Sequence, residues 1–302
     1  MTTNQQLIMD RPDELGVKSS ATAQSTIKTI LVHIQDDGSL DQRIESGLSL
    51  ARASSAHLNC LHVTPIEAYA AFDSFGGVFV MTDAVKALDD EEIRIRAKVE
   101  DKLRREDVSW DYTQVTGNVA SQIISYAALA DLVLVGREPR KSDFVGSNVS
   151  LIGDLLQRSR TPLFIPAENG APTDPNGVAL IAWDGSYEAA NAVRLSVGLL
   201  KMAAEVHVVQ IEEKKGETFP NTRLLEYLSR QGIHADLVVE PAPTGQKDQQ
   251  TIAASLMAHA RTVSAAYLVM GGYSHSRIAE YVFGGVTRTM LGGSTVPLVI
   301  AR

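Results

Sequence analysis

The sequence predicts an α/β protein of two tandem, doubly wound, five-stranded parallel sheets with helices on both faces. The first observation is an internal repeat: segment 130–136 recurs as 265–271, and segment 161–165 recurs as 296–300. Both pairs are separated by 135 positions, so the two copies keep the same internal spacing. The second observation is that short apolar runs alternate with segments of helical period. That alternation is typical of parallel strands joined by right-handed helical crossovers.

In the first copy, continuous apolar runs mark strands, and apolar residues at helical spacing mark the helices between them. The predicted strands are 30–34, 58–63, 110–115, 132–135 and 163–165. The predicted helices carry three apolar series: Ile44, Leu48 and Ala51; then Val85, Leu88, Ile95, Val99 and Leu103; then Val119, Ile123 and Ala127. The second of these helices has a charged, solvated outer face, and Asn118 is expected to cap the third.

The second copy repeats this order. Its predicted strands are 178–183, 206–211, 235–239, 267–270 and 298–300, with helices over 188–202, 224–229 and 252–263 and a short helix carrying Val286, Met290 and Leu291. A stretch rich in proline and glycine separates the copies and marks a linker. The predicted domains are therefore 27–167 and 178–302, joined by a linker over 168–177 and preceded by a disordered tail over 1–26.

Composition excludes several classes of function. The formal net charge of −8 argues against electrostatic capture of nucleic acid or of an anionic membrane surface. No apolar stretch approaches the roughly 20 residues that a membrane span needs, and the N-terminus lacks a signal-peptide pattern, so a cytoplasmic location is expected. The lone cysteine, Cys60, lies in an apolar run and is interpreted as a buried core residue.

Ligands of doubly wound sheets bind beyond the carboxyl ends of the strands, where the strand order reverses. In the second copy this directs attention to two loops: the one after the first strand, at Asp184, and the one that follows the fourth strand from Gly271. Gly284 and Gly285 precede a short helix, so free amides and the helix dipole there favour a phosphate. Ser274, His275, Arg277 and Thr287 supply further donors.

The stretch from Gly271 to the second-copy strand 298–300 resembles the C-terminal signature of universal stress proteins. Nucleotide-binding members carry a glycine, two residues, a glycine, nine residues, then a glycine followed by serine or threonine. Here these positions hold Gly271, Ser274, Gly284 and Gly285, so two of the four match. Serine at a positive φ costs on the order of 1 kcal/mol, and the missing hydroxyl at 285 weakens phosphate binding by about as much.

The resemblance covers about residues 27–302 and implies a universal-stress-protein-like, adenine nucleotide-binding fold. It implies ATP or AMP as the ligand, with Mg²⁺ held through the phosphates, and places Asp184 and Ile211 against the adenine and ribose. The candidate nucleotide-binding residues are Ala182, Trp183, Asp184, Ile211, Gly271, Gly272, Ser274, His275, Arg277, Gly284, Gly285, Val286 and Thr287. The first copy lacks the signature spacing and is interpreted as a structural half without a ligand.

The family associates through the last strand of the domain. The resemblance therefore implies an internal pseudo-dimer through 163–165 and 298–300, with homodimerisation of chains and protein partners of unknown identity as further expectations. A second hypothesis is a structural or interaction protein of the same fold with degenerate pockets. A third is a hydrolase or adenylating enzyme, which no Walker loop, dinucleotide fingerprint or nucleophile elbow supports.

Several polar residues have structural interpretations. Asp36 and Asp37 are interpreted as helix caps, Asp184 as both cap and ligand contact, and Trp183 as a core residue. The cluster Arg137, Arg140 and Lys141 is interpreted as a solvated loop. His57 and His62 have opposite parity on one strand, so no metal site is expected there.

Overall fold

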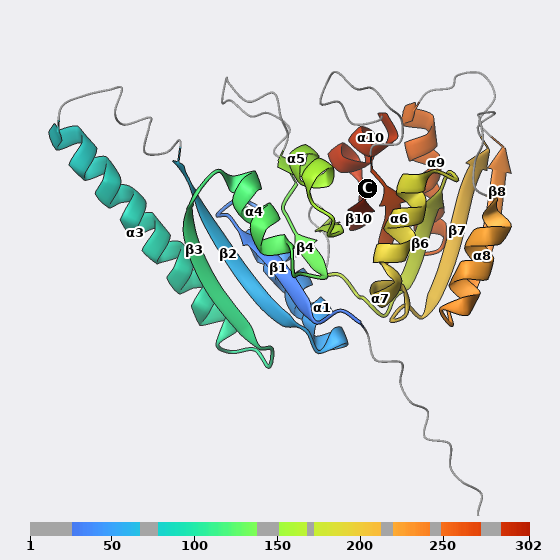
Figure 1. The fold of residues 1–302 in the computed structure, drawn as a ribbon, viewed down its shortest axis with the longest axis horizontal. Coiled ribbons are helices and arrows are strands. Elements are labelled where there is room, and N and C mark those ends of the chain that lie inside the picture. Colours follow the sequence, from blue (N-terminus) through green and yellow to red (C-terminus); the bar gives the residue numbers. More distant parts are fainter. Residues whose placement is uncertain are drawn as a thin grey trace, which may run out of the picture.

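The computed structural model describes residues 26–66, 78–137, 151–167, 172–212, 220–241, 249–272 and 285–302. Within these residues, ten strands form one continuous sheet in the order β3-β2-β1-β4-β5-β10-β9-β6-β7-β8. The strands of the first half are β1 (Thr29–Ile34), β2 (His57–Pro65), β3 (Trp110–Gly117), β4 (Leu132–Leu134) and β5 (Leu163–Ile165). Those of the second half are β6 (Val178–Trp183), β7 (Glu205–Glu212), β8 (Ala235–Pro241), β9 (Tyr267–Gly271) and β10 (Leu298–Ala301). The two halves therefore share one sheet (Figure 1).

Every pairing within a half is parallel, and the two halves meet through the antiparallel pair β5 and β10. In this central pair, Leu298 lies opposite Ile165 and Ile300 opposite Leu163. The sequence correctly predicted the parallel α/β fold class and named these two strands as the place where the halves associate. The domain boundaries at residues 167 and 178 stay predictions.

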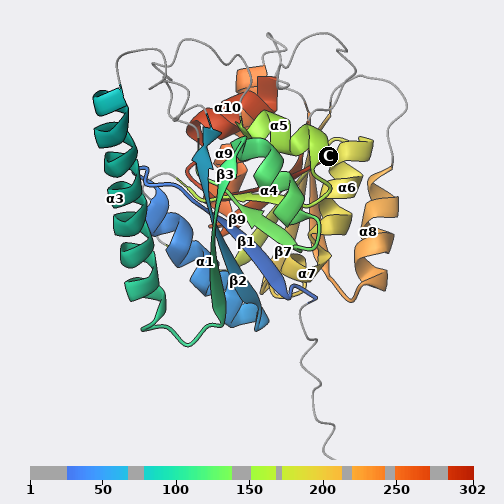
Figure 2. The ribbon, with the colours of Figure 1, turned by 60° about the vertical axis from the view of Figure 1, so that its left-hand side comes forward.

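Helices cover both faces of the sheet because successive strand residues are apolar on both sides. In β1, Ile30, Val32 and Ile34 belong to one core cluster, whereas Leu31 belongs to the other. The helices of the first cluster are α1 (Leu40–Ser54), α3 (Val78–Leu103), α6 (Tyr187–Leu195), α7 (Val197–Leu200) and α8 (Asn221–Arg230). Those of the second are α4 (Val119–Ala127), α5 (Leu151–Arg158), α9 (Gln249–Thr262) and α10 (Gly285–Gly293). In Figure 2, α1 and α3 lie on one side of β1 and β2, and α4 lies on the other.

Two helices differ from the sequence prediction. The single helix expected over 188–202 is divided at Ser196 into α6 and α7. The Ser196 amide donates to the carbonyls of both Ala192 and Val193, which tightens the last turn of α6. Helix α5 was not predicted, because its eight residues make too short a segment for helical period to stand out. The disordered tail expected over 1–26 lies almost wholly outside the described residues.

Two predictions for the first half are confirmed: Asn118 as a helix cap and Cys60 as a core residue. The Asn118 side chain accepts a hydrogen bond from the Ser121 amide at 3.0 Å and caps α4. Cys60 is 2% exposed. Burial raises the pKa of its thiol to about 12, with a smaller contribution from Asp111. The Cys60 side chain is therefore an inert core group at neutral pH.

The interpretation of Arg137 as part of a solvated loop is wrong. Its guanidinium donates to the carbonyl oxygen of Pro166 in its own half at 3.0 Å. It also donates to the carbonyl oxygens of Leu291, in the last turn of α10, and Val296, at 3.2 and 3.4 Å. A cation at a helix C-terminus satisfies carbonyls that have no partner inside the helix. Arg137 therefore links the two halves, while Arg140 and Lys141 lie outside the described residues.

Part of the predicted linker also packs against the first half. Thr173 is buried, and its hydroxyl lies 3.5 Å from the hydroxyl of Ser46 on α1. No helix in the described part of the chain is long and apolar enough to cross a membrane.

Candidate functional site

The carboxyl ends of β6, β7 and β9 meet at one edge of the sheet in the second half. Strand β6 lies between the other two, with Ala182 opposite Met270 of β9 and Trp183 opposite Gln210 of β7. The residues that follow these pairs are Asp184, Ile211 and Gly271, so the topology brings these three predicted site residues together. This is the point of the strand order at which doubly wound sheets bind ligands.

The turn after β6 is held by its own polar side chains. The Asp184 carboxylate accepts a hydrogen bond from the Ser186 amide at 2.9 Å, and the Ser186 hydroxyl accepts one from the Ala189 amide at 3.1 Å. The cap of α6 is therefore Ser186, so the predicted capping role of Asp184 is wrong in its detail: Asp184 binds the amide of the cap residue instead. Gly185 has a φ of 73°, a conformation that a side chain would strain.

Gly271 at the end of β9 lies directly against the first turn of α6. A Cβ at this position would come 2.6 Å from the Ala189 amide nitrogen and 2.8 Å from the carbonyl carbon of Glu188. Gly272 follows in the same tight packing, donates its amide to the Ala301 carbonyl at 2.8 Å, and leaves no room for a Cβ beside Ile300. The glycine of the signature therefore permits an approach of two backbones that no other residue allows.

The remaining predicted residues are placed as follows. Trp183 is 5% exposed and belongs to the core, as interpreted, and Ile211 is 9% exposed at the end of β7. Gly285 begins α10, which confirms the short helix expected there, and Thr287 in its first turn is buried. Ser274, His275, Arg277 and Gly284 lie outside the described residues.

The corresponding place in the first half is filled by a buried arginine. Gly136 matches Gly271 in the repeat, and a Cβ on it would collide with the Arg43 guanidinium. Arg43 has no exposed side-chain surface, and its Nε donates to the His33 carbonyl at 2.7 Å. Its two terminal nitrogens donate to the Gln35 carbonyl at 2.9 Å, the Ser39 hydroxyl at 2.9 Å and the Asp37 carboxylate at 3.2 Å.

The interpretation of Asp36 and Asp37 as helix caps is therefore wrong in its details. Ser39 is the N-cap residue of α1. The Asp37 carboxylate accepts hydrogen bonds from the amide and hydroxyl of Ser39 and also forms an ion pair with Arg43. Asp36 instead forms an ion pair with Arg94 on α3 at 2.7 Å. Counted from the helix caps Ser39 and Ser186, Ala190 of α6 takes the position that Arg43 has in α1. The two strand-end sites therefore differ at this position, where the first half holds a guanidinium and the second half holds an alanine.

His33 lies beside this arginine, and its environment predicts a pH dependence of stability. Burial, assisted by the charge of Arg43 and opposed by Asp37, lowers the pKa of His33 to about 3. Below the ordinary pKa near 6.5, the unfolded chain takes up a proton that the folded chain refuses. The free energy of unfolding should therefore fall as the pH decreases from about 6.5 towards 3, by up to about 1.4 kcal/mol per pH unit from this residue alone.

Urea unfolding at a series of pH values measures this slope. His33→Leu should flatten it, and His234→Gln, which changes an exposed histidine, should leave it as it is. An unchanged slope in the His33 variant would contradict the assignment.

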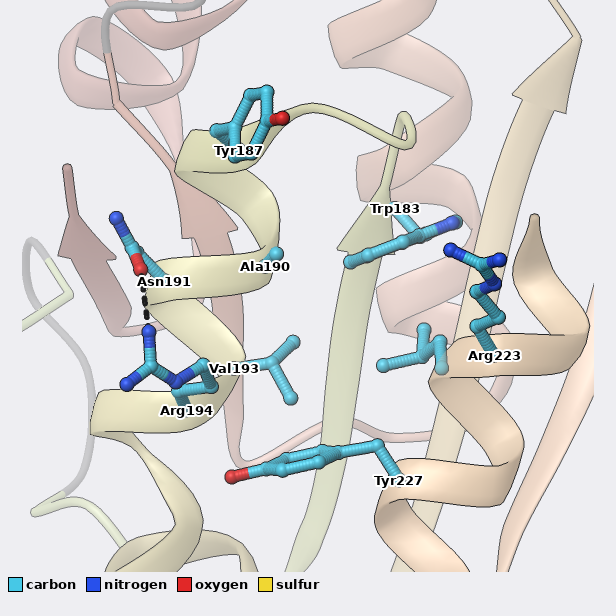
Figure 3. A pocket seen from close by; sticks show the side chains of 9 residues that line it. Trp183, Tyr187, Ala190, Asn191, Val193, Arg194, Arg223 and Tyr227 are labelled. Atoms are coloured by element: carbon cyan, nitrogen blue, oxygen red, sulfur yellow. Dashed lines mark hydrogen bonds between the residues drawn. The ribbon is translucent and has the colours of Figure 1, made fainter. Parts of the chain in front are cut away.

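A cavity of about 220 Å³ lies between α6 and α8, on the face of β6 (Figure 3). The residues that line it are Trp183, Tyr187, Ala190, Asn191, Val193, Arg194, Arg223, Leu224 and Tyr227. Of these, the sequence singled out only Trp183. The aromatic and arginine residues of α8 gave no local signal, because their spacing fits an ordinary amphipathic helix with a solvated face. Among the described residues, no group of three histidine, cysteine or acidic side chains is arranged to hold a metal ion.

Comparison with known proteins shows the fold. The most similar solved structures include a universal stress protein from Archaeoglobus fulgidus, 14% identical, which aligns over 91% of this chain and 98% of its own with a TM-score of 0.68. A universal stress protein from Pseudomonas aeruginosa, described as putative, is 17% identical over 92% of this chain and 94% of its own, with a TM-score of 0.56. The sequence itself matches no family model and no curated protein. The chain thus has the fold of tandem universal stress proteins over nearly its whole length.

Proposed function

We propose that the second half of this chain binds an adenine nucleotide, ATP or AMP, and that the protein acts in a stress response by presenting its occupied state to protein partners. The observation that supports this most is the convergence of the β6 turn and the end of β9. Asp184, the capped N-terminus of α6 and Gly271 form one surface at the switch point of the sheet.

The residues present there suit a nucleotide. Asp184 offers a carboxylate for ribose hydroxyls, and the N-terminus of α6 carries amides that favour negative charge. Gly271 keeps the backbone free of a side chain where the chain continues into the predicted phosphate loop. Mg²⁺ would be held through the phosphates of the ligand. The protein supplies binding without catalysis, and the first half, with Arg43 in its site, supplies structure.

Thermal unfolding in the presence of nucleotide tests this proposal. A nucleotide present at 100 times its dissociation constant stabilises a protein by about 2.7 kcal/mol, so millimolar ATP or AMP with Mg²⁺ should raise the melting temperature clearly. Asp184→Ala should reduce the shift, whereas Asp236→Ala, which removes an exposed carboxylate from β8 of the same half, should leave it intact.

The absence of any shift, together with no nucleotide released from the purified protein on denaturation, would contradict the proposal. It would favour a structural or interaction protein of the same fold instead. Release of ADP or AMP in proportion to protein, abolished by Asp184→Ala, would show catalysis and contradict a purely binding role.

A further inference from the structure

The cavity between α6 and α8 contains two hydrogen-bond donors without acceptors. Trp183 is only 5% exposed, and its indole Nε1 has no hydrogen-bond partner among the described residues. Arg223 projects from the first turn of α8, and within the described part of the chain its guanidinium has no hydrogen bond or ion pair. Figure 3 shows the guanidinium directed towards the end of the indole that carries Nε1. Buried donors are almost always satisfied, so the buried indole nitrogen of Trp183 indicates a missing acceptor. Arg223 is exposed and places a positive charge at the same end of the cavity.

The charge of the lining specifies what kind of acceptor is missing. Two arginines, Arg194 and Arg223, border the cavity, and none of the described residues that line it is acidic. Arg194 donates to the Asn191 side chain at 3.2 Å, so the main acceptor among the lining side chains is already engaged. A neutral indole donor next to a guanidinium matches a carboxylate, which accepts both bonds at once.

The walls specify the rest of the ligand. Val193 and Leu224 are buried and apolar, and the ring of Tyr227 closes the cavity at the end away from Trp183 (Figure 3). An apolar cavity of about 150 Å³ accommodates benzene, so about 220 Å³ accommodates one aromatic ring with a short acidic side chain. A nucleoside triphosphate is too large for it, because pockets for larger ligands usually exceed about 300 Å³.

We propose that this cavity binds a small aromatic carboxylate, with its ring against Val193, Leu224 and Tyr227 and its carboxylate accepting hydrogen bonds from Trp183 Nε1 and Arg223. The site is separate from the strand-end surface at Asp184 and Gly271. It opens between two helices on one face of the sheet, and it gives the second half a sensor for an organic acid in addition to its proposed nucleotide.

Nuclear magnetic resonance with phenylacetate as the probe tests the proposal. The chain has two tryptophans, so its ¹⁵N spectrum has two indole signals, and Trp183→Phe assigns them. Phenylacetate should shift the Trp183 signal in a saturable manner and leave that of Trp110 on β3 in place. Phenylacetamide, which has the same shape without the charge, should bind at least about tenfold more weakly, since hydrogen bonds to a charged group are the stronger ones.

Arg223→Gln should weaken phenylacetate binding about tenfold or more by calorimetry. Arg230→Gln on the same helix is the matched control, because Arg230 is exposed, pairs with Glu226 and does not line the cavity. Saturating ATP should leave phenylacetate affinity unchanged, and this result separates the inference from the nucleotide proposal. Lack of saturable binding, equal affinity for phenylacetamide, an unaffected Arg223→Gln variant, or displacement by ATP would each overturn it.

Discussion

Replacing Arg43 with methionine is expected to lower the free energy of unfolding by about 3–5 kcal/mol, as loss of one partner of a buried ion pair usually does. Methionine retains the apolar stem but removes the donor to the carbonyls of His33 and Gln35 and the ion-pair partner of Asp37. Each unsatisfied buried acceptor carries its own desolvation penalty. Urea unfolding followed by circular dichroism measures the change.

The matched control is Arg52→Met on the same helix. Arg52 is 41% exposed and pairs with Glu106 and Asp107 near the surface, so its loss should cost about 0–1 kcal/mol. Arg43→Lys should also be destabilising, because an ammonium does not reproduce the fork of the guanidinium. If Arg43→Met costs no more than Arg52→Met, the guanidinium does not hold the turn after β1.

Gly271→Ala is expected to destabilise the second half by about 1–3 kcal/mol, the usual cost of forcing an extra carbon into a packed core. The new Cβ would meet backbone atoms of Glu188 and Ala189, which move only if the first turn of α6 moves. The same shift would separate the two sides of the strand-end surface. Nucleotide stabilisation should therefore fall along with intrinsic stability.

Gly292→Ala is the control for this substitution. Gly292 lies in α10 with open space around the added carbon, and alanine is the better helix former by about 1 kcal/mol. This variant should be neutral or more stable in thermal melts. Equal melting temperatures for the two variants would show that the first turn of α6 moves away from an added Cβ at Gly271 without a cost in stability.

The sequence predicted the sheet well because each strand assigned in one copy of the repeat can be compared with its counterpart in the other copy. Segments 130–136 and 265–271 became β4 and β9 at the same spacing from β5 and β10, so one correct strand fixed its counterpart. The convergence of Asp184 with Gly271 also followed, because strand order alone brings the carboxyl ends of neighbouring parallel strands together. Local pattern was sufficient for both.

The features that escaped prediction depend on tertiary contacts. Arg43 lies between Leu40 and Ile44 on the buried face of α1. Charged residues are rarely buried, so the sequence pattern at this position indicates an interruption of the apolar face and not a core residue. Arg137 finds two of its acceptors more than 150 positions away, at Leu291 and Val296. The unpartnered nitrogen of Trp183 belongs to a residue that lines the cavity between α6 and α8, and no spacing in the sequence encodes that packing.

The antiparallel join of β5 with β10 has a consequence for stoichiometry. When two identical chains pair, they bring two equal sites, and occupancy of one can influence the other. Here the pairing occurs in cis between unequal halves, because Arg43 fills the strand-end site of the first half and Ala190 stands at the matching position of α6. If the second half binds nucleotide as proposed, each chain should take up one equivalent along a simple hyperbola, and the covalent link between the halves fixes that ratio.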